Sequence, residues 1–292
     1  MSQVTNFSFP FPESSWQELK KFLRRLGAEI TEIPYGFQAR HGDSVLNWYP
    51  SGKLVIQGSD AADLAEELYL MGLVKTGWTR KSEPRIGVDE SGKGDYFGPL
   101  VIAGALLTPE QEPALIRLGV RDSKSISDSS IKKTAAELEK ILPHTKIAIG
   151  PKKYNELHLQ MKNVNRILAW GHARAIENLL EKHPVQLAVS DQFGDESLIL
   201  NALMQKGKNI KLVQRHRGEE DLAVACASIL ARAEFLQRLE QLSKHFGVNL
   251  PKGMSDLTLE AGRQLVNKAG EGALEEAAKI HFKTTAKIIG PH

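Results

Sequence analysis

The first eighty residues alternate between helix-like and strand-like patterns of hydrophobic positions. A stripe at helical spacing predicts a helix that ends at Gly27, and Ser14 or Ser15 is expected to cap its start. A second helix is expected from about Ser59. Between the two helices, turn residues separate four strand-like runs, at 28–33, 37–41, 45–49 and 54–57. These patterns predict a small α+β domain.

From Arg85 the chain alternates between buried-type strands and helices. Strands are expected at 85–89, 100–108, 146–150, 185–190 and 210–214. Helices are expected at 131–141, 164–182, 196–205, over some twenty residues from Glu219, and at 258–268 and 273–282. This alternation predicts an α/β fold with a mixed sheet. Because 76–84 is polar and ends in a proline, we expect two domains, residues 1–80 and 81–292.

Composition narrows the class of protein without identifying the function. With 41% hydrophobic and 25% charged residues, the chain is neither wholly disordered nor fibrous. Its longest apolar runs are too short to cross a bilayer, its N-terminus lacks an export signal, and its single cysteine, Cys226, fits a reducing compartment. We therefore expect a cytoplasmic protein without a membrane partner. A net charge of +3 is only a weak argument for a polyanionic ligand.

The strongest chemical signal is the segment Asp89-Glu-Ser-Gly-Lys-Gly-Asp95, directly after a predicted strand. If the strand ends at Asp89, the chain can bend there and aim both Asp89 and Glu90 at one site. The two glycines of the segment are expected to adopt unusual φ values, and Lys93 could neutralise a phosphate. A solvated acidic turn is the plain alternative.

Further acidic residues follow two other elements. Asp191 ends the strand 185–190, and ligands of open α/β sheets bind beyond the carboxyl ends of strands. A helix cap is the alternative role for Asp191. The acids of Arg217-Gly-Glu-Glu-Asp221 precede an apolar helix, where the helix dipole alone would favour them. Converging carboxylates would bind Mg²⁺ or Mn²⁺, and two such ions could activate water and stabilise the leaving oxygen of a phosphodiester.

The segment Asp89-Glu-Ser-Gly-Lys-Gly-Asp-Tyr-Phe-Gly-Pro-Leu-Val closely resembles the first motif of bacterial ribonuclease HIII, a type 2 ribonuclease H. Ser91 and Lys93 favour this family over the related ribonuclease HII proteins, which usually carry alanine and arginine there. The resemblance covers nearly all of 85–285. Its further matches are Val120-Arg-Asp-Ser-Lys124, Tyr154-Asn155, Asn163-Val-Asn165, Asp191-Gln-Phe, Ala223–Arg232 and His281-Phe-Lys.

The resemblance implies an endonuclease that hydrolyses the RNA strand of RNA–DNA hybrids and leaves 5′-phosphate and 3′-hydroxyl ends. It implies a ribonuclease H-like mixed sheet with flanking helices, preceded by a substrate-binding domain that resembles the TATA-binding protein, and no obligate protein partner. Two Mg²⁺ or Mn²⁺ ions would be held by the catalytic set Asp89, Glu90, Asp191 and Glu219. Substrate would be bound by Ser91, Gly92, Lys93, Gly94 and Lys124.

The fourth carboxylate has three candidates, Glu219, Glu220 and Asp221. Consecutive helical residues differ in direction by about 100°, so the three cannot serve one site alike. Because Gly218 lets the chain turn just before Glu219, we select Glu219. The competing functions are another two-metal nuclease and an inactive nucleic-acid-binding module. The Asp-Ser-Lys and Ala-Ser-Ile-Leu-Ala-Arg segments argue against the first, and the retained acids argue against the second.

Overall fold

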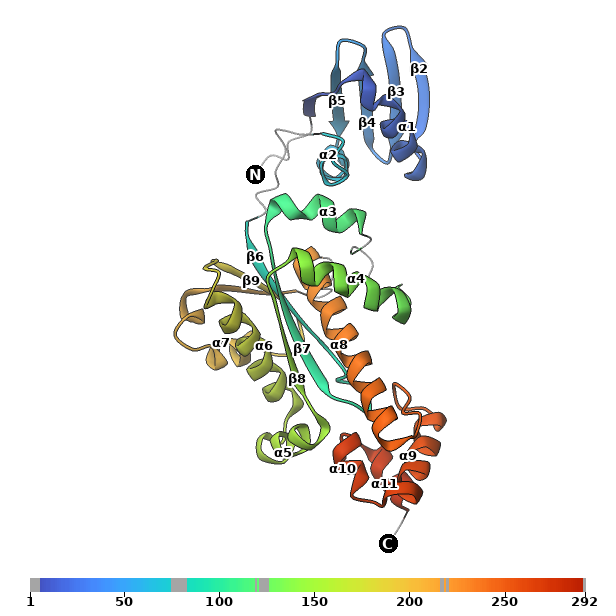
Figure 1. Cartoon of the computed structure of the whole chain (residues 1–292). Coiled ribbons are helices and arrows are strands. Elements are labelled where there is room, and N and C mark those ends of the chain that lie inside the picture. Colours follow the sequence, from blue (N-terminus) through green and yellow to red (C-terminus); the bar gives the residue numbers. More distant parts are fainter. Residues whose placement is uncertain are drawn as a thin grey trace. The chain divides into compact units, whose positions relative to one another are not determined.

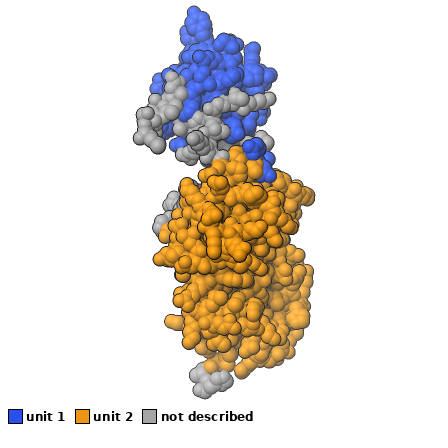
Figure 2. All heavy atoms as spheres, turned by 90° about the vertical axis from the view of Figure 1, so that its left-hand side faces the viewer, with its two compact units in different colours: residues 1–82, 110–117 blue, residues 83–109, 118–292 orange. Residues whose placement is uncertain are grey.

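The chain forms two compact units. The computed structural model describes residues 6–74, 83–118, 120, 126–215, 218 and 221–290. Unit 1 comprises Met1–Ser82 and Glu110–Arg117, and unit 2 comprises Glu83–Pro109 and Leu118–His292 (Figure 2). The short segment 110–117 is thus grouped with unit 1, although it follows the boundary expected near residue 80. The assignment of separate roles to the two domains stays a prediction.

Unit 1 is built on a five-stranded antiparallel sheet in the order β1-β5-β4-β3-β2 (Figure 1). Four of its strands match the four expected runs. The sequence interpretation missed β1, a short segment that ends in Pro10. In the structure β1 pairs along its whole length with β5. The strands are β1 (Asn6–Pro10), β2 (Glu29–Ile33), β3 (Gly36–His41), β4 (Ser44–Tyr49) and β5 (Lys53–Gly58).

Helices of unit 1 supply the rest of its core. These are α1 (Trp16–Arg25), α2 (Ala61–Leu70) and α3 (Glu112–Arg117). A turn precedes α2, and a 3₁₀ segment precedes α3. Leu19 and Leu23 of α1 are fully buried in one apolar cluster with alternate residues of the strands. Ser15 occupies the N-cap position of α1, as expected, but the capping hydrogen bond of its side chain is missing. Both serines lie in the 3₁₀ turn Glu13–Ser15.

Unit 2 contains the mixed sheet that the alternating pattern predicts. Its order is β10-β9-β6-β7-β8, with β6, β9 and β10 mutually parallel and β7 antiparallel to both of its neighbours. The strands are β6 (Arg85–Ser91), β7 (Leu100–Leu107), β8 (His144–Ile149), β9 (Leu187–Asp191) and β10 (Lys211–Arg215). The carboxyl ends of β6, β8 and β9 therefore lie at one edge of the sheet.

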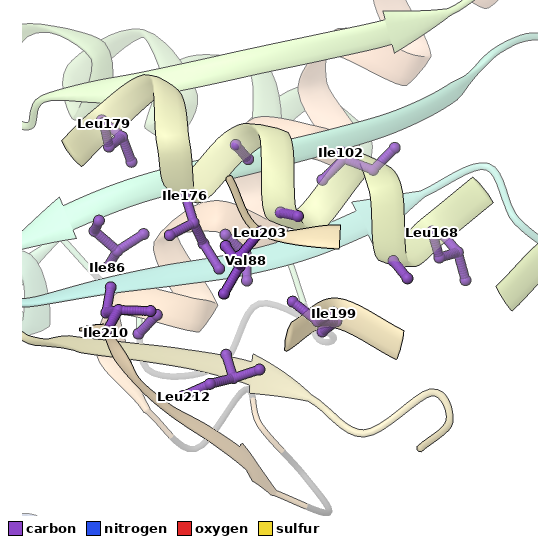
Figure 3. Packing of buried hydrophobic residues seen from close by; sticks show 14 of the residues in the cluster. Ile86, Val88, Ile102, Leu168, Ile176, Leu179, Ile199, Leu203, Ile210 and Leu212 are labelled. Carbon is purple, nitrogen blue, oxygen red and sulfur yellow. The ribbon is translucent and has the colours of Figure 1, made fainter. Parts of the chain in front are cut away.

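Helices cover both faces of this sheet. On one face, α6 (Val164–Leu180) and α7 (Glu196–Ala202) bury an aliphatic cluster that includes Val88, Ile102 and Ile176 (Figure 3). On the other face lie α8 (Leu222–Phe246) and α4 (Asp128–Ile141). Because side chains alternate along a strand, neighbouring residues of β6 contact different helices.

The C-terminal region departs from the expected pair of helices. It folds as three helices, α9 (Asp256–Ala269), α10 (Ala273–Ala277) and α11 (Lys283–Ile289). Earlier in the chain, the structure also contains a helix that was not expected, α5 (Pro151–Met161). The predicted helix 273–282 begins as expected but ends at Ala277, because Ala278 leaves the helix and forms an isolated β-bridge with Phe97. Within the described ranges, no helix is both long and apolar enough to cross a membrane.

Gly87 fixes how closely α8 approaches β6. A Cβ atom built on Gly87 would lie 2.0 Å from the backbone carbonyl carbon of Ala223, so the strand and the helix touch through their backbones. Small residues at the start of α8, including Ala223 and Ala227, make this approach possible.

We predict that Gly87→Ala destabilises unit 2 by about 3 kcal/mol or more, since backbone must move to admit the methyl group. For a domain of this size the loss corresponds to a fall in Tm of roughly 6–12 °C. Thermal unfolding followed by circular dichroism measures it. Gly150→Ala is the matched control, because nothing lies within 4 Å of its added Cβ. An equal Tm for both variants would contradict the close approach.

Candidate metal and active site

The candidate site lies where β6 and β9 lose their mutual pairing. Their ladder ends at Val88↔Ser190, whereas β6 stays paired with β7 as far as Ser91↔Val101. Asp191 is the last residue of β9, as expected. The expected strand end at Asp89 is wrong, because pairing with β7 keeps Asp89 and Glu90 within β6.

Asp89 and Glu90 consequently leave the strand on opposite faces. Asp89 accepts a hydrogen bond from Ser228 of α8 and another, at 2.8 Å, from the backbone N–H of Glu90. The Glu90 carboxylate instead meets His172 of α6, whose Nε2 lies 3.1 Å from Oε2. The bend expected at Asp89 is therefore wrong, since both residues stay within the paired strand. The two acids flank the end of β6.

Asp191 faces the same side of the sheet as Asp89. Its neighbour Ser190 contacts His172 on the α6 face, so alternation turns Asp191 toward the α8 face. Oδ1 of Asp191 accepts the backbone N–H of Gly218 at 2.9 Å. The structure thus brings together three of the acids selected from the sequence.

Burial and neighbouring charges shift the pKa values of Asp89 and Glu90 in opposite directions. Burial, and then the negative charges of Glu90 and Asp191, raise the pKa of Asp89 to about 7. Burial also acts to raise the pKa of Glu90, but its hydrogen bond and ionic contacts with His172 and Lys93 outweigh this, and the net pKa is lowered. A cation placed between the acids would remove the repulsion that raises the pKa of Asp89.

The donor chemistry fits hard divalent ions, since the described residues of the site offer carboxylate oxygens and neither thiolates nor free imidazole nitrogens. In the part of the chain that the structure describes, no group of three or more Asp, Glu, His or Cys residues is close enough to enclose an ion by itself. Glu219 and Glu220 lie outside the described residues.

The third candidate for the fourth carboxylate, Asp221, has a different role. It caps α8 by accepting the N–H of Ala223 at 2.9 Å, and it accepts the Arg85 Nε–H at 2.8 Å in a mostly buried ion pair. Gly218 lies directly against Asp191, where a Cβ atom would fall 2.6 Å from the Asp191 Cα. The chain therefore passes Asp191 at the residue that precedes Glu219.

Residues 92–94, called here the glycine-lysine loop, directly follow β6. Gly92 has φ +89°, and a Cβ atom there would lie 2.3 Å from the carbonyl oxygen of Pro99, so only glycine fits. The unusual φ expected at Gly94 is wrong, but open space surrounds Gly94, with nothing within 4 Å of an added Cβ. Lys93 is 40% exposed and lies 3.6 Å from Glu90 Oε1. Ser91 ends β6, and Lys124 lies outside the described residues.

Two buried polar residues beside this loop escaped the sequence interpretation. Lys279 is fully buried and donates to the carbonyl oxygens of Asp95 and Gly98 at 2.9 and 2.8 Å, which ties the loop to the C-terminal helices. Burial lowers the pKa of its ammonium group to about 7. The other residue is His172. The available signal was a polar residue at an otherwise apolar position, since Leu168 and Ile176 lie one turn before and after His172.

The Tyr154-Asn155 motif supports the fold rather than the chemistry. Asn155 Nδ2 donates to the carbonyl oxygen of Ala278 at 2.9 Å, and its Oδ1 accepts the N–H of Ile280 at 3.1 Å. Tyr154 is fully buried beside these contacts. Cys226 is buried in α8, where burial raises the pKa of its thiol to about 12. It is a core residue, as expected.

Comparison with known proteins gives a consistent family. A family model of ribonuclease HII matches residues 86–285. Ribonuclease HIII of Protochlamydia amoebophila is 44% identical over 282 residues, which cover 94% of this chain and 93% of that protein. Ribonuclease HIII of Chlamydia felis is 37% identical, with 97% of each chain covered.

The fold agrees with this assignment. The crystal structure of Bst-RNase HIII in complex with Mn²⁺ matches with a TM-score of 0.68 at 29% identity, over 98% of each chain. The ribonuclease H-like mixed sheet expected from the motifs is thereby confirmed. The chain belongs to the ribonuclease HII family, and its near full-length relatives within that family are ribonuclease HIII proteins.

Proposed function

We propose that this protein is a metal-dependent endoribonuclease that hydrolyses the RNA strand of RNA–DNA hybrids. Two observations carry this function. Buried acids gather where the pairing of β6 with β9 ends, and the chain belongs to a ribonuclease H family. The products are expected to carry 5′-phosphate and 3′-hydroxyl ends.

In this proposal Asp89, Glu90, Asp191 and Glu219 hold two divalent ions, Mg²⁺ or Mn²⁺. The Mn²⁺ complex of Bst-RNase HIII supports the choice of metal. When bound, such ions activate a water molecule and stabilise the charge that develops on the phosphodiester oxygens. The chain supplies rigid placement, because Asp89 and Glu90 lie in a paired strand and Asp191 is fixed by the Gly218 N–H.

The support for Glu219 comes from its described neighbours. Asp221 is already engaged as a helix cap and with Arg85, whereas Gly218 contacts Asp191. A residue that directly follows Gly218 can reach the metal ligands over a short path. We therefore assign Glu219 as the fourth carboxylate.

Substrate would approach over the glycine-lysine loop. Open space around Gly94 would admit a sugar-phosphate backbone, and the exposed ammonium group of Lys93 could contact a phosphate. Ser91, Gly92 and Lys124 complete the proposed substrate-binding set. Backbone contacts there could read the 2′-hydroxyl that distinguishes RNA from DNA.

Unit 1 is proposed to bind the hybrid outside the active site. Its helix α1 presents the exposed side chains of Lys21, Arg24 and Arg25, and Lys20 lies over the Trp16 ring, 4.2 Å from its centroid. Basic side chains on one helix give a local phosphate-binding surface although the domain as a whole is nearly neutral. A cytoplasmic location and the lack of an obligate protein partner stay predictions.

Cleavage of three matched labelled duplexes tests the function. With Mg²⁺ or Mn²⁺, the RNA–DNA hybrid should be cut in its RNA strand, while the DNA duplex and the RNA duplex should stay intact. Excess EDTA should stop the reaction. Cutting of the DNA duplex at a similar rate would indicate a different nuclease, and binding of the hybrid without cleavage under any metal condition would indicate an inactive binding module.

We predict that Asp191→Asn abolishes cleavage while the fold and hybrid binding remain, since shape is kept and a charge that holds the metals is lost. In the same assay, Glu219→Gln should reduce turnover at least about 100-fold, and Glu220→Gln should have a mild effect. A severe loss with Glu220→Gln and a nearly silent Glu219→Gln would place the fourth carboxylate one residue later.

The raised pKa of Asp89 predicts how metal-free stability changes with pH. Unfolded protein releases this proton near pH 3.8, whereas folded protein holds it until about pH 7. Folding stability therefore falls as pH rises through this window, and the whole cost is present at pH 8. In EDTA at pH 8, Asp89→Asn should be more stable than wild type by about 2–4 kcal/mol, with a smaller difference at pH 5. Thermal unfolding measures both, and saturating Mg²⁺ should stabilise only the wild type.

Charge reversal on α1 tests the role of unit 1. Replacing Lys21, Arg24 and Arg25 with glutamate should weaken hybrid binding and flatten its dependence on salt, because fewer counterions are released on binding. The turnover rate at saturating hybrid should change little. Fluorescence anisotropy at several salt concentrations gives both affinity and slope. Unchanged values would show that this helix does not contact the substrate.

A further inference from the structure

A histidine buried in α6 links the two strands that carry the acids. His172 has no exposed surface, and its ring centroid lies 4.8 Å from that of Phe193, with the two ring planes inclined at 61°. Nε2 of His172 lies 3.1 Å from Glu90 Oε2, and Nδ1 lies 3.1 Å from Ser190 Oγ. One rigid ring thus connects the carboxylate on β6 to the residue that precedes Asp191 on β9.

The direction of the bond to Glu90 follows from its acceptor. A carboxylate only accepts hydrogen bonds, so the Nε2–H of His172 donates to Glu90. Ser190 Oγ lies within 2.9 Å of the Asp191 carbonyl oxygen as well as near Nδ1. When its hydroxyl hydrogen faces Nδ1, Ser190 donates to the ring and holds it in plane with the Nε2–H aimed at Glu90.

The two oxygens of Glu90 have different surroundings. Oε2 faces the buried ring of His172, while Oε1 lies 3.6 Å from the ammonium nitrogen of the partly exposed Lys93. A long lysine side chain loses several rotamers when it is fixed, whereas a buried imidazole is already held by packing. His172 is therefore the group that sets the rotamer of Glu90 and leaves its other lone pairs directed away from α6.

We propose that His172 is a positioning residue for the divalent ions: it orients the Glu90 carboxylate and, through Ser190, couples it to the end of β9 that carries Asp191. The inference rests on the proposed function of these acids. Partners that orient metal ligands typically change metal affinity or activity 10–100-fold when removed. The alternative is a purely structural role, in which the buried ring only stabilises the fold.

Metal binding measured apart from catalysis distinguishes the two roles. Mn²⁺ is titrated into the intact, hybrid-free protein by calorimetry, and Tm is measured in EDTA. His172→Phe keeps the ring but removes both nitrogens, and we expect it to bind Mn²⁺ about 10–100-fold more weakly than wild type. His172→Gln, which retains an N–H donor, should recover part of the affinity, and Ser190→Ala should show a smaller loss than His172→Phe.

Ile176→Ala is the matched control, because it also disturbs the buried face of α6, one turn away, and its aliphatic side chain has no hydrogen bond to offer Glu90. It should lower Tm and leave Mn²⁺ affinity unchanged. In cleavage assays His172→Phe should need more Mg²⁺ for half-maximal rate while KM for the hybrid stays constant. If His172→Phe does not fold, His172→Gln and Ser190→Ala decide the question by the same titration.

The outcomes separate this inference from the proposed function. The positioning role would be overturned if folded His172→Phe, or both His172→Gln and Ser190→Ala, bound Mn²⁺ as tightly as the wild type. Hybrid cleavage by the wild type would still support the proposed function. Equal weakening by Ile176→Ala would also overturn the positioning role, since the effect would then follow stability alone. Failure of the wild type to bind Mn²⁺ and to cleave any hybrid would reject the function itself.

Discussion

The crowding of like charges at the end of β6 is the constraint on which the rest of unit 2 depends. Asp89, Glu90 and Asp191 lie close enough for burial and mutual repulsion to raise the pKa of Asp89 to about 7. Such a cluster persists in a folded protein only when surrounding groups over-determine its geometry. Here Ser228, His172 and the Gly218 N–H each hold one carboxylate from a different element.

Those elements are fixed by contacts that leave little room for adjustment. Backbone contact at Gly87 sets the position of α8 and hence of Ser228, and the aliphatic layer under α6 sets the position of His172. The buried ammonium group of Lys279 joins the glycine-lysine loop to the C-terminal helices. A site built on strands and helices in this way keeps its ligands in place before metal or substrate arrives.

Side chains of the same type take different roles here according to position alone. Asp221 and Asp191 are both aspartates beside the sheet, but Asp221 caps α8 and pairs with Arg85, while Asp191 faces Asp89 where the pairing of β6 with β9 ends. Composition and local patterning treat such residues alike. Their difference arises because the ladder of β6 and β9 opens one residue after Val88, which exposes one end of the sheet to polar side chains.

The sequence alone determined the order of the strands along unit 2, the family motif around Asp89, and the position of Asp191 at a strand end, because periodicity and strand-end chemistry are local properties. It could not determine that β6 continues to Ser91, since this depends on pairing with β7, nor that Asp89 and Glu90 then diverge to α8 and α6. His172 and the Arg85–Asp221 pair were equally hidden. Their partners lie 82 and 136 residues away along the chain, and only tertiary packing brings such groups together.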